Sequence, residues 1–124
     1  MKVCFCGHIH TGTFDIRAKQ IAATRPNEWS WCAMHEIDKK INEVDLFCII
    51  KLADPEFFNY IKKRGKKVVY DVLDCWGQPK HDIALNSLNR TRQFFIDRLG
   101  EIKLDGVIFS NKLMREDFNH LVPN

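Results

Sequence analysis

Short apolar runs alternate with amphipathic stretches of helical periodicity along the whole chain. The apolar runs are continuous rather than alternating, which is typical of strands buried on both faces of a parallel sheet. We expect strands at residues 2–6, 28–34, 46–50, 67–72 and 106–109. We expect helices at residues 14–24, 36–42, 55–64, 82–98 and 111–119.

This order of elements predicts an α/β fold. Strands that are separated by helices pair in parallel, and right-handed crossovers place helices on both faces of the sheet. We therefore predict a Rossmann-like three-layer α/β/α sandwich with a parallel sheet of about five strands in the order 3-2-1-4-5. The chain has 124 residues, which is the size of one domain, so we expect residues 1–124 to form a single domain.

Local signals mark the ends of two helices. Asp54 and Pro55 suit the N-cap and the first helical position, and Gly65 suits the left-handed position after a helix end. The helix at residues 14–24 should bury a face made of Ile16, Ala18, Ile21 and Ala22.

Composition and charge narrow the class of protein. Hydrophobic residues make up 45% and charged residues 28%, which excludes a disordered chain. The net charge is only +3, and we interpret the basic run at residues 62–67 as a solvated helix end, so nucleic acid is not the expected partner. No apolar run reaches the length of a membrane span.

Five cysteines are scattered along the chain without a CxxC pair. We expect Cys4 and Cys6 to point to opposite faces of the first strand, so we predict no metal site. Free cysteines in apolar runs are typical of a reducing compartment. We therefore expect a cytoplasmic protein, with a location at a membrane surface left open for a longer form of the chain.

Polar residues follow several of the predicted strands. In open parallel sheets, ligands bind beyond the carboxyl ends of the strands, here at the switch between the first and fourth strands. The candidates for catalysis at this edge are Asp71, Asp74 and His10. The candidates for ligand binding are Gly7, His8, Thr11, Gly12, Thr13, Arg17, Lys51, Trp76, Ser110 and Asn111.

The loop at residues 7–13 matches no nucleotide motif fully. Its two glycines have the spacing of a P-loop, but the lysine of that motif is missing, and the loop is not GxGxxG. His8 and His10 lack the HxGH order of nucleotidylyltransferases. The loop is suited either to receiving an anion or a sugar hydroxyl on its backbone N–H groups or simply to turning from a strand into a helix.

Two acidic residues and one basic residue are further candidates for catalysis or ligand binding. Asp71 ends a buried strand, where reduced solvation suits a carboxylate to act as a base or an acceptor, and Asp74 lies beside Trp76, which can stack on a sugar. The alternative interpretation is that one of the two acids caps the next turn. Arg17 either binds a phosphate or carboxylate of a ligand or forms a salt bridge with a local acid.

Three segments together resemble the N-terminal domain of GT-B glycosyltransferases. The first is Ile49-Ile50-Lys51 with the stretch from Lys62-Lys63-Arg64-Gly65-Lys66-Lys67 to Val68-Val69-Tyr70-Asp71-Val72-Leu73-Asp74. The second is Thr11-Gly12-Thr13-Phe14-Asp15-Ile16-Arg17-Ala18, and the third is Leu104-Asp105-Gly106-Val107-Ile108-Phe109-Ser110-Asn111.

The resemblance implies an enzyme that transfers a sugar from a nucleotide-sugar donor without a bound cofactor or metal. It implies that this domain holds the acceptor, a carbohydrate or glycolipid, and that Gly12, His10, Asp71 and Asp74 face a cleft between two domains. The second, donor-binding domain has no counterpart before Asn124. We therefore expect a fragment or half-enzyme that is inactive alone and that could form a homo-oligomer through its exposed face.

Other classes of protein share the predicted fold. A stand-alone module that binds a sugar or nucleotide without catalysis is the main alternative. A receiver domain is disfavoured because Gly7-His8 and Lys51 stand where its acidic residues would be. A nucleotidylyltransferase remains a weaker alternative.

Overall fold

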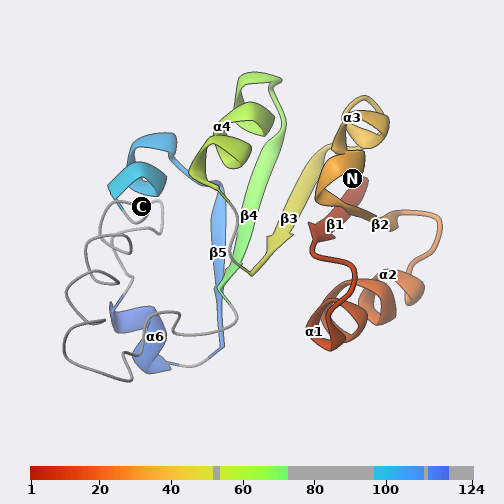
Figure 1. Cartoon of the computed structure of the whole chain (residues 1–124), viewed down its shortest axis with the longest axis horizontal. Helices are drawn as coiled ribbons and strands as arrows, with labels where there is room; N and C mark the ends of the chain where they lie inside the picture. The colour runs from red at the N-terminus through yellow and green to blue at the C-terminus, as the bar shows by residue number, and fades with distance from the viewer. Residues whose placement is uncertain (52–53, 73–96, 111, 118–124) are drawn as a thin grey trace.

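Five parallel strands form a single sheet in the computed structural model, which describes residues 1–51, 54–72, 97–110 and 112–117. The strands are β1 (Val3–Gly7), β2 (Trp29–Ala33), β3 (Leu46–Ile50), β4 (Lys67–Val72) and β5 (Gly106–Phe109). Their order across the sheet is β2-β1-β3-β4-β5, and every neighbouring pair is parallel (Figure 1). The predicted α/β class with a five-stranded parallel sheet is thus confirmed.

Helical segments connect the strands. The first connection is one continuous helix made of α1 (Gly12–Phe14), a π-helical segment (Asp15–Gln20) and α2 (Ile21–Ala23). The second is a 3₁₀ turn (Met34–Glu36) followed by α3 (Ile37–Lys40). The remaining helices are α4 (Pro55–Lys63), residues 97–102 and α6 (Lys112–Asp117).

The predicted strand order 3-2-1-4-5 is wrong in its first three positions. The chain crosses back over β1 after β2, so that β3 lies on the other side of β1. The reason is burial: β3 has four fully buried residues and takes the centre, whereas β2 carries the exposed Trp31 and takes the edge. The switch in strand order therefore lies between β1 and β3 instead of between β1 and β4.

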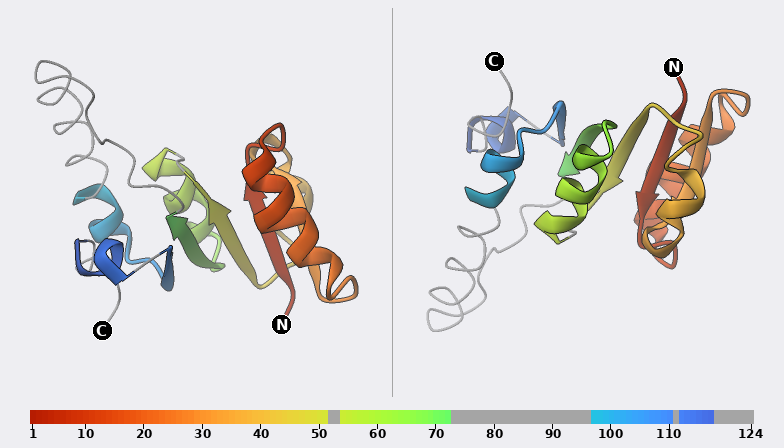
Figure 2. Two further views of the ribbon diagram at one scale, coloured as in Figure 1. Left: turned by 90° about the horizontal axis from the view of Figure 1, so that it is seen from below. Right: turned by 90° about the horizontal axis from the view of Figure 1, so that it is seen from above.

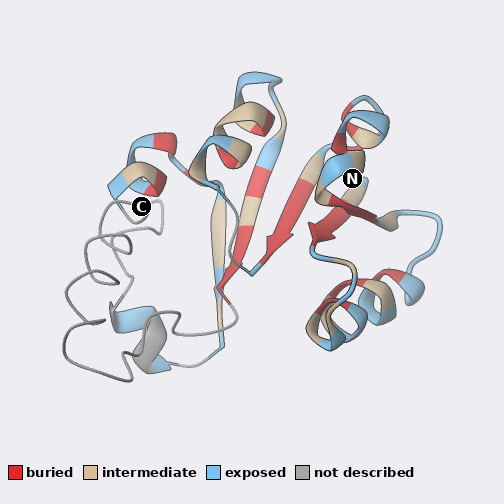
Figure 3. Ribbon diagram, in the orientation of Figure 1, coloured by how far each residue is buried: buried red, intermediate tan, exposed pale blue. Residues whose placement is uncertain are grey.

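Helices cover both faces of the sheet, as the sandwich architecture requires. On one face, α3, α4 and residues 97–102 bury Ile37, Phe58 and Leu99 against the sheet. On the other face, the helix that begins at Gly12 buries Phe14 and Ala18. Figure 2 shows that helix lying along β1, and Figure 3 shows the buried central strands between helices whose outer faces are exposed.

The first helix buries a different face from the one predicted. Ala18 and Ala22 are buried as expected, but Ile16 and Ile21 are 60% and 39% exposed. The π-helical segment widens the turn, and the inward positions follow the spacing of Phe14, Ala18 and Ala22. The predicted face was also too wide for any helix, because Ile16 is two positions from Ala18 and residues two apart do not share a helix face.

Cys4 and Cys6 lie on the same face of β1, so the expectation of opposite faces is wrong. Residues two positions apart on a strand share a face, because side chains alternate with a period of two. Both thiols join Cys32 of the neighbouring strand in the core under α3, and the Sγ atoms of Cys4 and Cys32 are 3.5 Å apart. All three cysteines, like Cys48, are buried free thiols.

The ends of α4 follow the sequence signals. The Asp54 side chain accepts a hydrogen bond from the Glu56 backbone N–H at 2.8 Å, with Pro55 at the first helical position. Gly65 adopts a left-handed conformation with φ of 73° just after the helix end. Both predictions are confirmed, since the capping side chain and the glycine satisfy the geometric needs of a helix start and a helix end.

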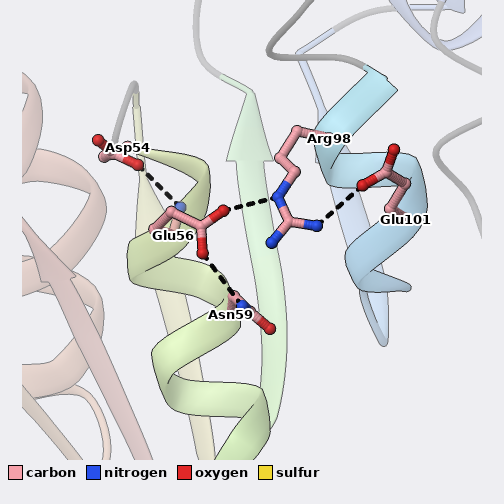
Figure 4. Close-up of polar contacts among 5 residues, drawn as sticks. All are labelled: Asp54, Glu56, Asn59, Arg98 and Glu101. Atoms are coloured by element: carbon pink, nitrogen blue, oxygen red, sulfur yellow. Dashed lines mark hydrogen bonds and ion pairs between the residues drawn. The ribbon is translucent and has the colours of Figure 1, made fainter.

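A polar bridge ties α4 to the helical residues 97–102 (Figure 4). The Arg98 guanidinium donates to Glu56 at 2.6 Å and to Glu101 at 2.8 Å, and Glu56 also accepts from the amide of Asn59 at 3.1 Å. These helices pack on the same face of the sheet, so the bridge fixes their spacing above β4 and β5. No helix in the described part of the chain is both long and apolar enough to span a membrane.

The packing predicts a large difference between two adjacent phenylalanines of α4. Phe58 is fully buried and meets the ring of Tyr70 edge-on at 5.2 Å, whereas Phe57 is only half-buried. We expect Phe58→Ala to lower the free energy of unfolding by about 3–5 kcal/mol, and Phe57→Ala to cost clearly less. Urea unfolding of both variants measures this; equal losses would contradict the described core.

Candidate functional site

The carboxyl ends of β1, β3, β4 and β5 form one edge of the sheet, at the bottom of Figure 1. Gly7, Lys51, Asp71 and Ser110 stand at or beside these strand ends. Parallel pairing brings them together, although they are widely spaced in the sequence. This edge is where the sequence analysis placed the site.

Asp71 is the buried charged group of this edge. It is the only buried polar or charged residue among those described, with 4% of its surface exposed. It precedes the last residue of β4 and pairs in register with Ile50 and Ile108 of the flanking strands. A carboxylate at this position needs a partner, because an unpaired buried charge is strongly unfavourable.

Arg17 is that partner. Its Nη1 lies 3.1 Å from both carboxylate oxygens of Asp71, and the two residues are 54 positions apart. Its Nη2 lies 3.5 Å from the hydroxyl of Ser110, which in turn donates to the Val72 carbonyl at 3.4 Å. Through the Arg17 side chain, the helix that starts at Gly12 is thus linked to β4 and to the end of β5.

Burial and pairing act in opposite directions on Asp71. Burial raises the pKa of this carboxyl, while the charge and the hydrogen bonds of Arg17 lower it, and the balance leaves the pKa above its ordinary value. Burial likewise raises the pKa of the Cys48 thiol to about 12, and the nearby Asp71 carboxylate adds to the rise. The inner side of the site is therefore poorly solvated, whereas the Arg17 side chain is 32% exposed.

Lys51 holds an uncommon backbone conformation at the end of β3. Its φ is 67°, in the left-handed region that few residues other than glycine adopt. Its backbone N–H donates to the carbonyl of Asp71 at 3.1 Å. Backbone strain of this kind is found at functional sites, and here it turns the chain at the same point where Asp71 is buried.

The loop after β1 turns tightly into the first helix. The Thr11 hydroxyl accepts a hydrogen bond from the Phe14 N–H at 3.2 Å and donates to the His8 carbonyl at 3.0 Å. Gly7 is buried, and a Cβ atom there would lie 3.1 Å from the Ile50 carbonyl and from the Phe14 ring. The glycine is required by close packing between β1, β3 and this helix.

The structure brings together only some of the predicted site residues. Arg17, Lys51, Asp71 and Ser110 meet at the edge, and Gly7 and Thr11 shape the neighbouring turn. His8, His10 and Gly12 are exposed, and neither histidine makes a side-chain hydrogen bond with the described residues; Thr13 is half-buried. Asp74, Trp76 and Asn111 lie outside the described residues, so their predicted roles remain predictions.

Sequence reasoning missed two features of this site. Arg17 pairs with the distant Asp71, whereas the sequence analysis considered a ligand anion or a local acid. Cys48, under the carboxylate, was interpreted only as a core residue. Among the described residues, no three His, Cys, Asp or Glu side chains are grouped so as to hold a metal ion.

The buried pair predicts a specific effect of Arg17→Gln. Since Arg17 lowers the pKa of Asp71, the variant should shift the carboxyl titration to higher pH in carbon-13 NMR. A raised folded-state pKa favours stability below the ordinary value of about 3.9 and loses it as pH rises through the folded-state pKa. We therefore expect the variant to be less stable by about 1–3 kcal/mol at neutral pH, with the difference shrinking in acid.

Lys112→Gln is the matched control, because Lys112 pairs with Glu116 on the exposed surface of α6. It should leave the Asp71 titration unchanged and cost less than about 1 kcal/mol. An Asp71 titration in Arg17→Gln that coincides with that of the unmodified protein would show that the two side chains are not coupled in solution.

Two glycines of the same loop provide a test of its packing. Gly7→Ala should cost about 1–3 kcal/mol, because the added methyl group crowds the Ile50 carbonyl and the Phe14 ring. Gly12→Ala meets nothing within 4 Å and lies in the first turn of the helix, so it should be neutral or slightly stabilising. Chemical unfolding of the two variants distinguishes them, and a neutral Gly7→Ala would contradict the tight turn.

Comparisons with models of protein families, with curated proteins and with solved structures found no match for this chain. The candidate site is therefore defined by its own geometry: a poorly solvated carboxylate that is held by an arginine at the carboxyl edge of a parallel sheet.

Proposed function

We propose that this domain is the acceptor-binding half of a nucleotide-sugar-dependent glycosyltransferase of the GT-B type. The observation that carries the proposal is the buried Asp71, held by Arg17 at the carboxyl edge of the sheet. Sugars are recognised through hydroxyl groups that donate to carboxylates, and a carboxylate in a poorly solvated site is a strong acceptor. The resemblance of the sequence to GT-B N-terminal domains supports the same assignment.

The residues of the edge suggest how an acceptor would be held. Asp71 would accept a hydrogen bond from the reacting hydroxyl and promote its attack, with Arg17 fixing the orientation of the carboxylate. Ser110 and the backbone near Lys51 would contact the rest of the sugar. We propose Asp74 and His10 as further catalytic groups and Trp76 and Asn111 as further ligand-binding groups; of these four, only His10 lies within the described residues.

The nucleotide-sugar donor would be bound mainly by a second domain across this edge. We therefore propose that the 124-residue chain binds an acceptor but does not transfer sugar alone. The free thiols of the core favour a reducing compartment such as the cytoplasm. Pairing with a second copy would be another way to cover the exposed edge.

The test is a titration of the isotope-labelled chain, followed by NMR, with simple glycosides and with nucleoside diphosphate sugars. We expect glycosides to shift the amide signals of residues 7–13, Lys51, Asp71 and Ser110. Asp71→Asn should weaken this binding by roughly 10- to 100-fold, because it replaces a charged acceptor by a neutral one. Asp45→Asn, which changes an aspartate at the opposite edge, should leave the affinity unchanged.

Each other outcome has a definite meaning. Binding of nucleotides without any glycoside binding would favour a nucleotide-binding module and overturn the acceptor-side proposal. Glycoside binding that Asp71→Asn and Asp45→Asn weaken equally would place the sugar elsewhere. Sugar transfer by the purified chain would contradict the need for a second domain.

A further inference from the structure

The amino ends of the strands form a second edge, opposite the candidate site and at the top of Figure 1. Backbone hydrogen bonds give its order. The N–H groups of Asp45 and Leu46 donate to the Lys2 carbonyl, and the N–H of Lys67 donates to the Asp45 carbonyl at 3.2 Å. The N–H of Asp105 donates to Val68 at 2.9 Å. These residues lie side by side across four strands, each about 4.8 Å from the next.

Basic side chains gather along this edge. The turn at Gly65, with its positive φ, brings the last turn of α4 next to the start of β4. Lys103 adopts φ of 60° and directly precedes the segment that pairs with Val68. The lysines that this arrangement places together are Lys63, Lys66, Lys67 and Lys103, and all except the half-buried Lys66 are exposed.

The two carboxylates of this edge accept hydrogen bonds from within the protein. The Asp105 carboxylate accepts from the Lys62 ammonium and from the Val68 N–H, both at 2.7 Å. The Asp45 carboxylate accepts from the Lys2 backbone N–H at 2.7 Å. Within the described residues, Lys63, Lys66, Lys67 and Lys103 have no ion pair. The lysines of this edge therefore outnumber its two carboxylates, and the edge carries a net positive charge.

The basic groups of this edge are suited to a negatively charged surface and less to single-stranded nucleic acid. The free groups are lysines, which bind anions as point charges without a fixed geometry. Arg64, which lies next to Lys63 in the sequence, already interacts within the protein. Its guanidinium lies 3.3 Å from the centre of the Tyr60 ring and donates to the Tyr60 carbonyl. That stacking also covers the ring, so the cluster lacks the open aromatic platform with which proteins hold single-stranded nucleic acid.

We propose that the amino edge of the sheet docks on the surface of bilayers that contain anionic lipids. Lys63, Lys66, Lys67 and Lys103 attract the headgroups electrostatically, as clusters of lysines do at negatively charged membranes. Docking in this way leaves the carboxyl edge, with Asp71 and Arg17, facing away from the bilayer. The inference depends on the charge of the amino edge and does not rest on the proposed function.

The experiment is co-sedimentation of the purified chain with two kinds of vesicle, one of phosphatidylcholine alone and one in which about a third of the lipid is phosphatidylglycerol. We expect binding only to the anionic vesicles. Raising the salt should weaken that binding, because exposed charges are screened over about 10 Å at 0.1 M ionic strength and over much less at higher salt.

Two triple variants that remove equal charge locate the surface. Lys66→Gln, Lys67→Gln and Lys103→Gln together should weaken binding roughly 100-fold, since each lysine near an anionic surface contributes about a factor of five. Lys19→Gln, Lys112→Gln and Arg115→Gln remove the same charge away from the edge and should leave most of the binding. Circular dichroism checks that both triple variants are folded.

Three results would overturn the proposal. They are an absence of binding to anionic vesicles, an equal loss in the two triple variants, and tighter edge-dependent binding to a short single-stranded RNA than to the vesicles. None of these results bears on glycoside binding at Asp71, so the two proposals fail independently.

Discussion

The burial of one carboxylate organises much of this domain. Asp71 lies within the sheet, where a lone negative charge would be strongly unfavourable, and Arg17 is the group that makes it tolerable. For the Arg17 side chain to reach the carboxylate, the first helix must pack on the sheet at one particular rotation. The tight turn at Gly7 and the cap at Thr11 set that rotation, because they fix where the helix starts. The pair thus couples the position of a helix to the chemistry of the edge.

The elements that the structure describes were predicted well because their signals are local, whereas most of the helix predicted at residues 82–98 lies outside the described residues. The apolar runs of β3 and β4, the Asp54 cap and Gly65 all depend on neighbours within a few positions. The strand order depends on which strand can lie at the edge of the sheet, where side chains are more exposed. The 41% exposure of Trp31 is consistent with the edge position of β2. Continuous apolar runs look alike whether they lie at the centre or at the side of a sheet, so the pattern alone could not distinguish them.

The site was predictable in its location and less so in its contacts. The rule for parallel sheets selected Asp71, Lys51 and Ser110, and the structure brings them together. The pairing of Arg17 with Asp71 spans 54 residues, and no local pattern encodes a partner so distant. The inward face of the first helix was misjudged for a different reason: Ile16 is two positions from the buried Ala18, and residues two apart do not share a helix face.

The position of β1 has a consequence for how the chain acquires this structure. The first strand to be synthesised lies between β2 and β3, so it can gain one neighbour early but is fully enclosed only after residue 50 has been made. Arg17 can pair with Asp71 only after β4 has been made, because Asp71 lies in β4, which follows α4 in the chain. Contacts that close such long loops form late and slow the search for the native state. The Arg17–Asp71 ion pair is therefore one of the late contacts, because it cannot form before β4 has joined the sheet.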